Sequence, residues 1–159
     1  MQDDVKQSIV TALDLIEQEH GVKVVHAAET GSRAWGFEST DSDYDVRFVY
    51  VRPTNDYLSV YSIRDVIEIP ITGSLDITGW DIKKALQLLR KSNPPLLERL
   101  QSPFVYRDVN PIASRMRSLV SRFYSPKACS HHYFNMAEQN YRSYLKGADV
   151  WYKKYLYVL

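Results

Sequence analysis

The first part of the chain passes from a helical to a strand-like hydrophobic pattern. Val5, Ile9, Leu13 and Ile16 recur every three or four positions, which predicts a helix over residues 4–20. Two aspartates stand at the start of this helix and a glycine follows it, as the ends of a helix favour. Shorter runs rich in β-branched and aromatic residues come next, separated by turn residues. Strands are expected over residues 22–28, 44–51, 64–70 and 75–79, with a short helical turn over 32–37.

From residue 80 onward the apolar positions follow helical spacing. Asp81 can cap the first of these helices, and the prolines of Asn93-Pro94-Pro95 stop it. Further helices are expected over residues 95–101, 111–123 and 127–146, and from 149 to the end. The pattern therefore predicts an α+β fold: a small mixed β-sheet with helices on one side, followed by a helical region.

Residues 102–110 are the best candidate for a linker. Ser-Pro opens this stretch and Asn-Pro closes it, which favours a turn or loop at each end. The chain is accordingly expected to divide into residues 1–101 and a helical region of residues 102–159. The last five residues, 155–159, are apolar and carry no polar cap, which indicates a C-terminally truncated chain.

Composition narrows the class of protein. The 159 residues are 45% apolar and 25% charged, which suits one compact domain with at most a small appendage. No apolar run has the roughly 18 residues that a membrane span needs, and the N-terminus lacks a signal-peptide core. The single cysteine, Cys129, excludes an internal disulfide and a multi-cysteine zinc site. We expect a cytoplasmic protein that has no membrane partner.

The net charge of +1 conceals a division along the chain. Residues 1–80 carry a net charge of −8, and residues 81–159 carry +9. Such asymmetry suits an acidic half that binds cations and a basic half that meets anions.

Two closely spaced aspartates provide the first candidate chemistry. Asp43 and Asp45 are two positions apart at the head of an expected strand, so both side chains point to one face. Two carboxylates at close range repel each other by about 4 kcal/mol at an effective dielectric constant near 20, so a proton or a cation must lie between them. Carboxylate oxygens suit Mg²⁺, which commonly binds one or two of them together with substrate phosphates. Mn²⁺ is the alternative ion.

Gly31 and Ser32 form a second element of the same candidate site. They follow an expected strand and open a short helical turn, where free backbone N–H groups and the serine hydroxyl can bind a phosphate. Gly31 allows close approach of the backbone. Arg33, which comes next, can neutralise a triphosphate or be an ordinary surface arginine. Lys84 can likewise reach phosphates or be solvated.

The residues of this region resemble a known family. The spacing of Gly31-Ser32 and Asp43-x-Asp45 resembles the nucleotidyltransferase superfamily of DNA polymerase β. The longer strings GSRAWGFxSxDSDYDVR, DxxGWDIxKAL and KSNP are similar to a branch of bacterial and phage nucleotidyltransferases, some of them associated with RNA repair ligases. The resemblance covers most of residues 26–159. It implies a polymerase β-type catalytic core in residues 1–101 and a longer parent chain.

The resemblance also implies a third carboxylate on a later strand. The candidates are Asp76, Glu68 and Asp81. Asp76 is favoured because an aspartate inside a β-run, on the face opposite Leu75 and Ile77, needs a reason. Asp81 has a sufficient role as a helix cap, and Glu68 is expected on an edge strand.

The resulting hypothesis is a Mg²⁺-dependent transferase. It would move an NMP from an NTP to a hydroxyl acceptor, with an RNA or other nucleic acid end favoured. Asp43, Asp45 and Asp76 would hold two metal ions, as two-metal sites do. Two alternatives stay open: a nucleotide- or RNA-binding module with a relict site, and a transferase that modifies a protein hydroxyl. The sequence names neither the base nor the oligomeric state.

Of three further aromatic residues, one has a functional as well as a structural interpretation. Tyr133 can line a base pocket, although packing or exposure is the simpler interpretation. Trp35 and Trp80 are expected to be structural. Arg47 shares a strand face with Asp45 and can pair with an acid or contact substrate; pairing with an acid is the favoured interpretation.

Overall fold

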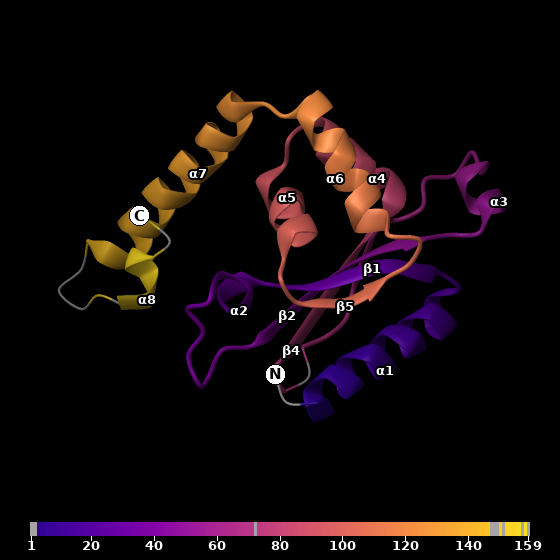
Figure 1. Cartoon of the computed structure of the whole chain (residues 1–159), viewed down its shortest axis with the longest axis horizontal. Helices are drawn as coiled ribbons and strands as arrows, with labels where there is room; N and C mark the ends of the chain where they lie inside the picture. Colours follow the sequence, from indigo (N-terminus) through magenta and orange to yellow (C-terminus); the bar gives the residue numbers. More distant parts are fainter. Residues whose placement is uncertain (1–2, 72, 147–149, 151, 157, 159) are drawn as a thin grey trace.

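A five-stranded mixed sheet forms the centre of the protein (Figure 1). The computed structural model of the chain describes residues 3–71, 73–146, 150, 152–156 and 158. The strands stand in the order β3-β4-β2-β1-β5. Their bounds are Lys23–Thr30 (β1), Tyr44–Val51 (β2), Val66–Glu68 (β3), Leu75–Asp81 (β4) and Val105–Asp108 (β5). β2 and β4 are parallel, and the other neighbouring pairs are antiparallel. The predicted α+β fold class is confirmed.

Helices pack on both faces of this sheet rather than on one. The helices are Asp3–His20 (α1), Gly31–Trp35 (α2), Thr54–Tyr57 (α3), Ile82–Arg90 (α4), Pro94–Gln101 (α5), Ile112–Phe123 (α6), Pro126–Asn140 (α7) and Tyr152–Tyr155 (α8), with a π-helix at Tyr141–Leu145. α1 covers one face and α4, α5 and α6 cover the other (Figure 1). The expectation of helices on one side was wrong because α1 contributes its own apolar stripe to a second core.

The alternation of β2 explains the two cores. Val46, Phe48 and Tyr50 point to the side of α1 and are fully buried there. Val49 points to the opposite side and packs among α4, α5 and α6. Asp45 and Arg47 share the face of Val49, because side chains two positions apart lie on one face. The candidate chemistry therefore faces the helices that follow the sheet.

Gly79 on β4 leaves room for one of these core residues. A β-carbon at Gly79 would lie 2.1 Å from a ring carbon of Phe48. The neighbouring strand thus carries a glycine because the phenyl ring occupies the space of a side chain.

Several segments differ from the expected elements. Residues 102–110, expected to be a linker, contain β5, which pairs with β1 at the edge of the sheet. The boundary between residues 101 and 102 stays a prediction. The expected helix over 127–146 changes to π-helical geometry at Tyr141. Within the described part of the expected last helix, Tyr152–Tyr155 are helical, and residues 149, 151, 157 and 159 lie outside the described residues.

None of the helices in the described part of the chain combines the length and the apolar character that crossing a membrane requires.

Candidate functional site

Asp45 and Asp76 lie directly opposite each other on the parallel strands β2 and β4. In-register residues of neighbouring strands project to the same face, so their carboxylates converge. One nitrogen of Arg47, Nη2, donates to Oδ1 of Asp45 at 3.1 Å and to Oδ2 of Asp76 at 2.7 Å. Nη1 of Arg47 also donates to the carbonyl oxygen of Asp76, at 2.8 Å. Two carboxylates thus share one cationic group, as the expected pairing of Arg47 with an acid requires.

The other two candidates for a third carboxylate lie elsewhere. Glu68 is exposed on the edge strand β3 and pairs with Arg64. Asp81 caps α4: its Oδ1 accepts a hydrogen bond from the N–H of Lys83 at 2.8 Å. Of the three, Asp76 is the residue that the fold brings beside Asp45.

Asp43 occupies a more open position. It is exposed, one residue before β2 begins, and its carbonyl oxygen accepts a hydrogen bond from Arg33. Within the described ranges no three side chains of the His, Cys, Asp or Glu type are grouped as metal ligands. The donor set nevertheless fits Mg²⁺, because two converging carboxylates supply hard oxygen ligands. Since Arg47 lies between Asp45 and Asp76, an ion held by both would have to displace its guanidinium.

Gly31 packs against Asp45, which together with Asp76 forms the acidic pair of the site. It has a φ of 63°, in the left-handed region, and a β-carbon there would lie 2.1 Å from Oδ2 of Asp45. The hydroxyl of the preceding Thr30 donates to the carbonyl oxygen of Asp45 at 3.0 Å. The Asp45 carboxylate therefore occupies the space that a side chain at position 31 would fill. Ser32 is buried, and its hydroxyl donates to Oγ of Ser42 at 3.2 Å.

Arg33 holds the loop that leads into β2. Its Nη2 donates to the carbonyl oxygen of Ser42 at 2.6 Å, and its Nε donates to that of Asp43 at 3.2 Å. The guanidinium also stacks 3.9 Å from the ring centroid of Tyr44. These contacts give Arg33 a structural role close to the aspartates.

Lys84 does not lie with the other candidates. It belongs to α4, which follows the far end of β4, and its Nζ pairs with Asp65 at 3.0 Å. Asp76 stands near the start of β4, and the strand from there to Asp81 is roughly 16 Å long at 3.3 Å per residue. Lys84 was expected at the site, but the length of β4 separates it from Asp76, because the two residues lie toward opposite ends of that strand.

A buried carboxylate supports the strand that carries Asp45. Glu29 is 1% exposed; its Oε1 accepts from the N–H of Asp45 at 2.8 Å, and its Oε2 accepts from the hydroxyl of Tyr106. Burial raises the pKa of Glu29 and that of Tyr106. Sequence reasoning missed this link because it joins β1, β2 and β5, and β5 was expected to be a loop.

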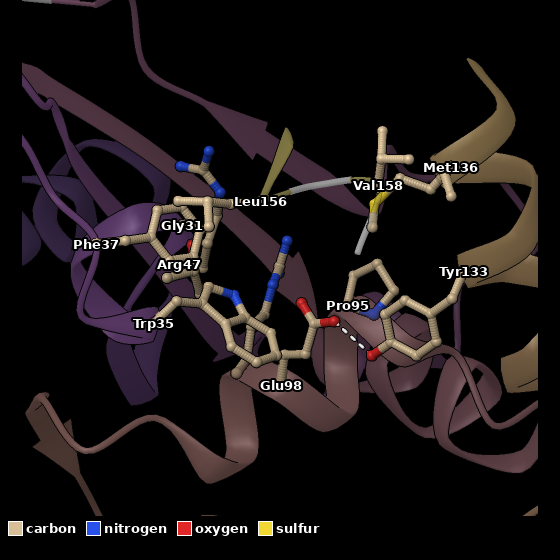
Figure 2. A pocket seen from close by; sticks show the side chains of 13 residues that line it. Gly31, Trp35, Phe37, Arg47, Pro95, Glu98, Tyr133, Met136, Leu156 and Val158 are labelled. Carbon is tan, nitrogen blue, oxygen red and sulfur yellow. Dashed lines mark hydrogen bonds between the residues drawn. The ribbon is translucent and has the colours of Figure 1, made fainter. Parts of the chain in front are cut away.

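A cavity of about 440 Å³ opens beside the acidic pair (Figure 2). α2, α5, α7 and the end of the chain contribute most of its walls. Its lining residues are Thr30, Gly31, Trp35, Phe37, Arg47, Pro95, Glu98, Arg99, Tyr133, Met136, Ala137, Leu156 and Val158. A space of this size is typical of small-molecule sites. Trp35, expected to be structural, and Tyr133, considered for a base pocket, both line it.

Arg99 is the least expected member of this lining. It is 8% exposed, and its guanidinium stacks 3.3 Å from the ring centroid of Trp80. Among the described residues, Nη1 of Arg99 has no hydrogen-bond partner. Burial, followed by the positive charge of Arg47, lowers the pKa of Arg99 to about 9. A buried cation with an unsatisfied donor favours an anionic neighbour.

Comparison with known proteins identifies the family of the chain. The sequence model of RlaP, the RNA repair pathway DNA polymerase beta family, matches residues 5–159. The chain is 53% identical over 154 residues to a protein of Bacillus subtilis (strain 168), the uncharacterized protein YcgL. The match covers 97% of this chain and 59% of that relative, so the chain spans about three fifths of the relative's length. The chain therefore belongs to the RNA repair pathway DNA polymerase beta family and, with it, to the polymerase β-like nucleotidyltransferases.

Proposed function

We propose that the protein transfers an NMP from an NTP to a hydroxyl acceptor, and that the acceptor is the end of an RNA. The observation that carries this proposal is the pairing of Asp45 with Asp76, whose shared partner Arg47 lines a cavity large enough for a nucleoside. Family membership supports nucleotidyl transfer, and the family's description supports RNA repair.

The carboxylates would hold Mg²⁺, or Mn²⁺ in its place. Asp45 and Asp76 would bind one ion, and the exposed Asp43 would help to bind a second. Divalent ions in such sites lower the pKa of an attacking hydroxyl and neutralise the charge of a leaving pyrophosphate. An ion held by the two carboxylates would take the place of the guanidinium of Arg47, which would then be available to the triphosphate.

The reaction would be an in-line displacement at the α-phosphorus. The acceptor oxygen forms a bond to phosphorus, the bond from phosphorus to the α–β bridging oxygen breaks, and pyrophosphate leaves with that electron pair. Asp76 orients the acceptor hydroxyl and takes its proton, which then passes to solvent. The backbone at Gly31 and Ser32 would bind the phosphates, with Arg33 keeping the adjoining loop in place.

The basic half of the chain supports a nucleic acid acceptor. Exposed lysines and arginines occur on α4, directly after α4, on α6 and at the start of α7, namely Lys83, Arg90, Lys91, Arg115, Arg122 and Lys127. Side chains of this kind bind nucleic acid mainly through its phosphates.

The test is metal-dependent turnover. Pyrophosphate release is measured with each of the four NTPs and bulk RNA, with and without Mg²⁺. The Asp43→Asn/Asp45→Asn double variant is compared with Asp41→Asn, which removes an exposed carboxylate from the same loop. Turnover by the wild type and by Asp41→Asn, but not by the double variant, is expected. Equal turnover by the double variant would contradict the proposed mechanism.

A further inference from the structure

The cavity beside the acidic pair has a polar group that phosphate binding does not explain. Glu98 is the one acidic residue among the described side chains that line it. Its Oε1 accepts a hydrogen bond from the hydroxyl of Tyr133 at 2.6 Å, which ties α5 to α7 (Figure 2). A carboxylate repels phosphates, so its place in a nucleotide cavity calls for a ligand group that donates hydrogen bonds.

The charges of the lining define two regions of the cavity. Arg47 and Arg99 supply positive charge, and Arg47 touches the acidic pair. Figure 2 shows Gly31 and Arg47 on one side and Tyr133 on the other, with Glu98 between them. A triphosphate is therefore favoured on the side of Gly31 and Arg47, and a base on the side of Glu98 and Tyr133.

The walls near Glu98 suit a planar base. The Trp35 side chain is 57% exposed, and Tyr133, Met136 and Pro95 add aromatic and apolar surface. Aromatic side chains stack on bases of any sequence, so stacking by itself does not select one. Trp35 and Glu98 also line a neighbouring cavity of about 160 Å³, below the size usual for small-molecule sites.

The carboxylate of Glu98 supplies the selectivity that stacking lacks. An ionised carboxylate only accepts hydrogen bonds, and its two oxygens match two donors side by side. On the Watson–Crick edges, adenine and cytosine each present one amine beside an acceptor, and uracil presents one N–H between two acceptors. Guanine alone presents two neighbouring donors, N1–H and the N2 amine.

We propose that the cavity binds the base of a guanine nucleotide, with Glu98 accepting hydrogen bonds from N1–H and the N2 amine, so that GTP is the donor substrate. This proposal rests on the proposed function. Tyr133 orients the carboxylate of Glu98, and Trp35 offers a stacking surface. A nucleotide lacking either donor leaves part of the carboxylate unpaired on binding.

The test measures binding without turnover. Analogues of the four NTPs and of ITP, each with a methylene group in place of the α–β bridging oxygen, are titrated calorimetrically into the protein with Mg²⁺. The GTP analogue should bind about 10- to 100-fold more tightly than those of ATP, CTP and UTP, the discrimination expected of a bidentate base contact. The ITP analogue lacks the N2 amine and should bind roughly 10-fold more weakly than that of GTP.

The Glu98→Gln variant links the preference to its residue. It should lose the advantage of the GTP analogue while still binding all four nucleotides. Glu138→Gln is the matched control, because Glu138 is an exposed glutamate of α7 that pairs with Arg142. Equal binding of all four analogues by the wild type, or a preference unchanged in Glu98→Gln, would overturn guanine selection and leave the transferase proposal standing. Absence of metal-dependent binding of any analogue would overturn both.

Discussion

Gly31 and Asp45 are so close that a β-carbon on the glycine would lie 2.1 Å from Oδ2 of the aspartate. Gly31→Ala should therefore displace the carboxylate and lower activity at least about 10-fold, because misplaced catalytic groups act poorly. The positive φ of Gly31 adds about 1–2 kcal/mol of destabilisation for any residue with a side chain. Activity and thermal unfolding are measured on the same samples.

Gly36→Ala supplies the control for this comparison. Gly36 also has a positive φ, 74°, but a β-carbon there would meet nothing within 4 Å. The same loss of stability with activity retained is expected. Equal loss of activity in both variants would mean that backbone strain, and not contact with Asp45, explains the effect.

The third carboxylate can be assigned by comparing two variants. Asp76→Asn should lower nucleotidyl transfer at least about 100-fold, because it removes the proposed metal ligand and proton acceptor. Glu68→Gln should leave activity unchanged, because Glu68 lies on the edge strand and pairs with Arg64. Circular dichroism checks that both variants fold. A loss of activity in Glu68→Gln, with Asp76→Asn active, would reverse the assignment.

Arg47 should compete with the metal ion for its two carboxylates. Its guanidinium occupies the place between Asp45 and Asp76, and hydrogen bonds to charged groups contribute about 1.5–3 kcal/mol. Arg47→Gln should therefore bind Mn²⁺ roughly 10-fold more tightly in the absence of nucleotide, as followed by electron paramagnetic resonance. Arg52→Gln, which alters an arginine paired with Asp81, should not change this affinity. Weaker Mn²⁺ binding in Arg47→Gln would show that the arginine shapes the site instead of blocking it.

His26 should make the protein less stable in acid. It is 1% exposed on β1, and neither ring nitrogen has a hydrogen-bond partner among the described residues. Burial lowers the pKa of His26 below its ordinary value of 6.5 and outweighs the attraction of Asp108. The folded state therefore resists protonation of His26. The protein loses stability as the pH falls below 6.5 toward the pKa of the folded state. Above pH 6.5 His26 is neutral in both the folded and the unfolded state and makes no pH-dependent contribution to stability.

Replacing His26 by a residue without a titratable group isolates its contribution to the pH dependence of stability. His26→Leu should lose less melting temperature between pH 7.5 and pH 5.5 than the wild type does. His131→Leu, at an exposed position of α7, should keep the pH dependence of the wild type. The raised pKa of Glu29 acts in the opposite direction, since its contribution is lost as the pH rises, but it is common to all three proteins. Identical pH dependence in His26→Leu and the wild type would contradict the prediction.

The sequence predicted the elements whose residues carry their own pattern. β2 has the expected bounds because polar and apolar residues alternate over its first half and β-branched or aromatic residues fill its second half, and α4 begins at the expected cap, Asp81. β5 was missed because its four residues gain their partners only from the edge of β1. No local pattern distinguishes such a strand from a loop.

The candidate site was predictable to the same extent. The spacing of Asp43 and Asp45 and the alternation around Asp76 can be read along the chain. The cavity cannot, because Glu98 and Tyr133 come from different helices and meet only in the folded protein. Arg99 gave no signal, since an arginine in an amphipathic helix is ordinarily solvated.

The pairing of β5 with β1 has a consequence for how the protein is made. His26 and Asp108 are partners although most of the described sheet lies between them in sequence. While the chain is still being synthesised, β1 leaves the ribosome long before β5, with one edge unpaired and Glu29 without the hydroxyl of Tyr106. Nascent chains that end before residue 105 should therefore be held in an aggregation-prone state. Glu29, which accepts a hydrogen bond from the N–H of Asp45, should gain its bond from Tyr106 only late in translation.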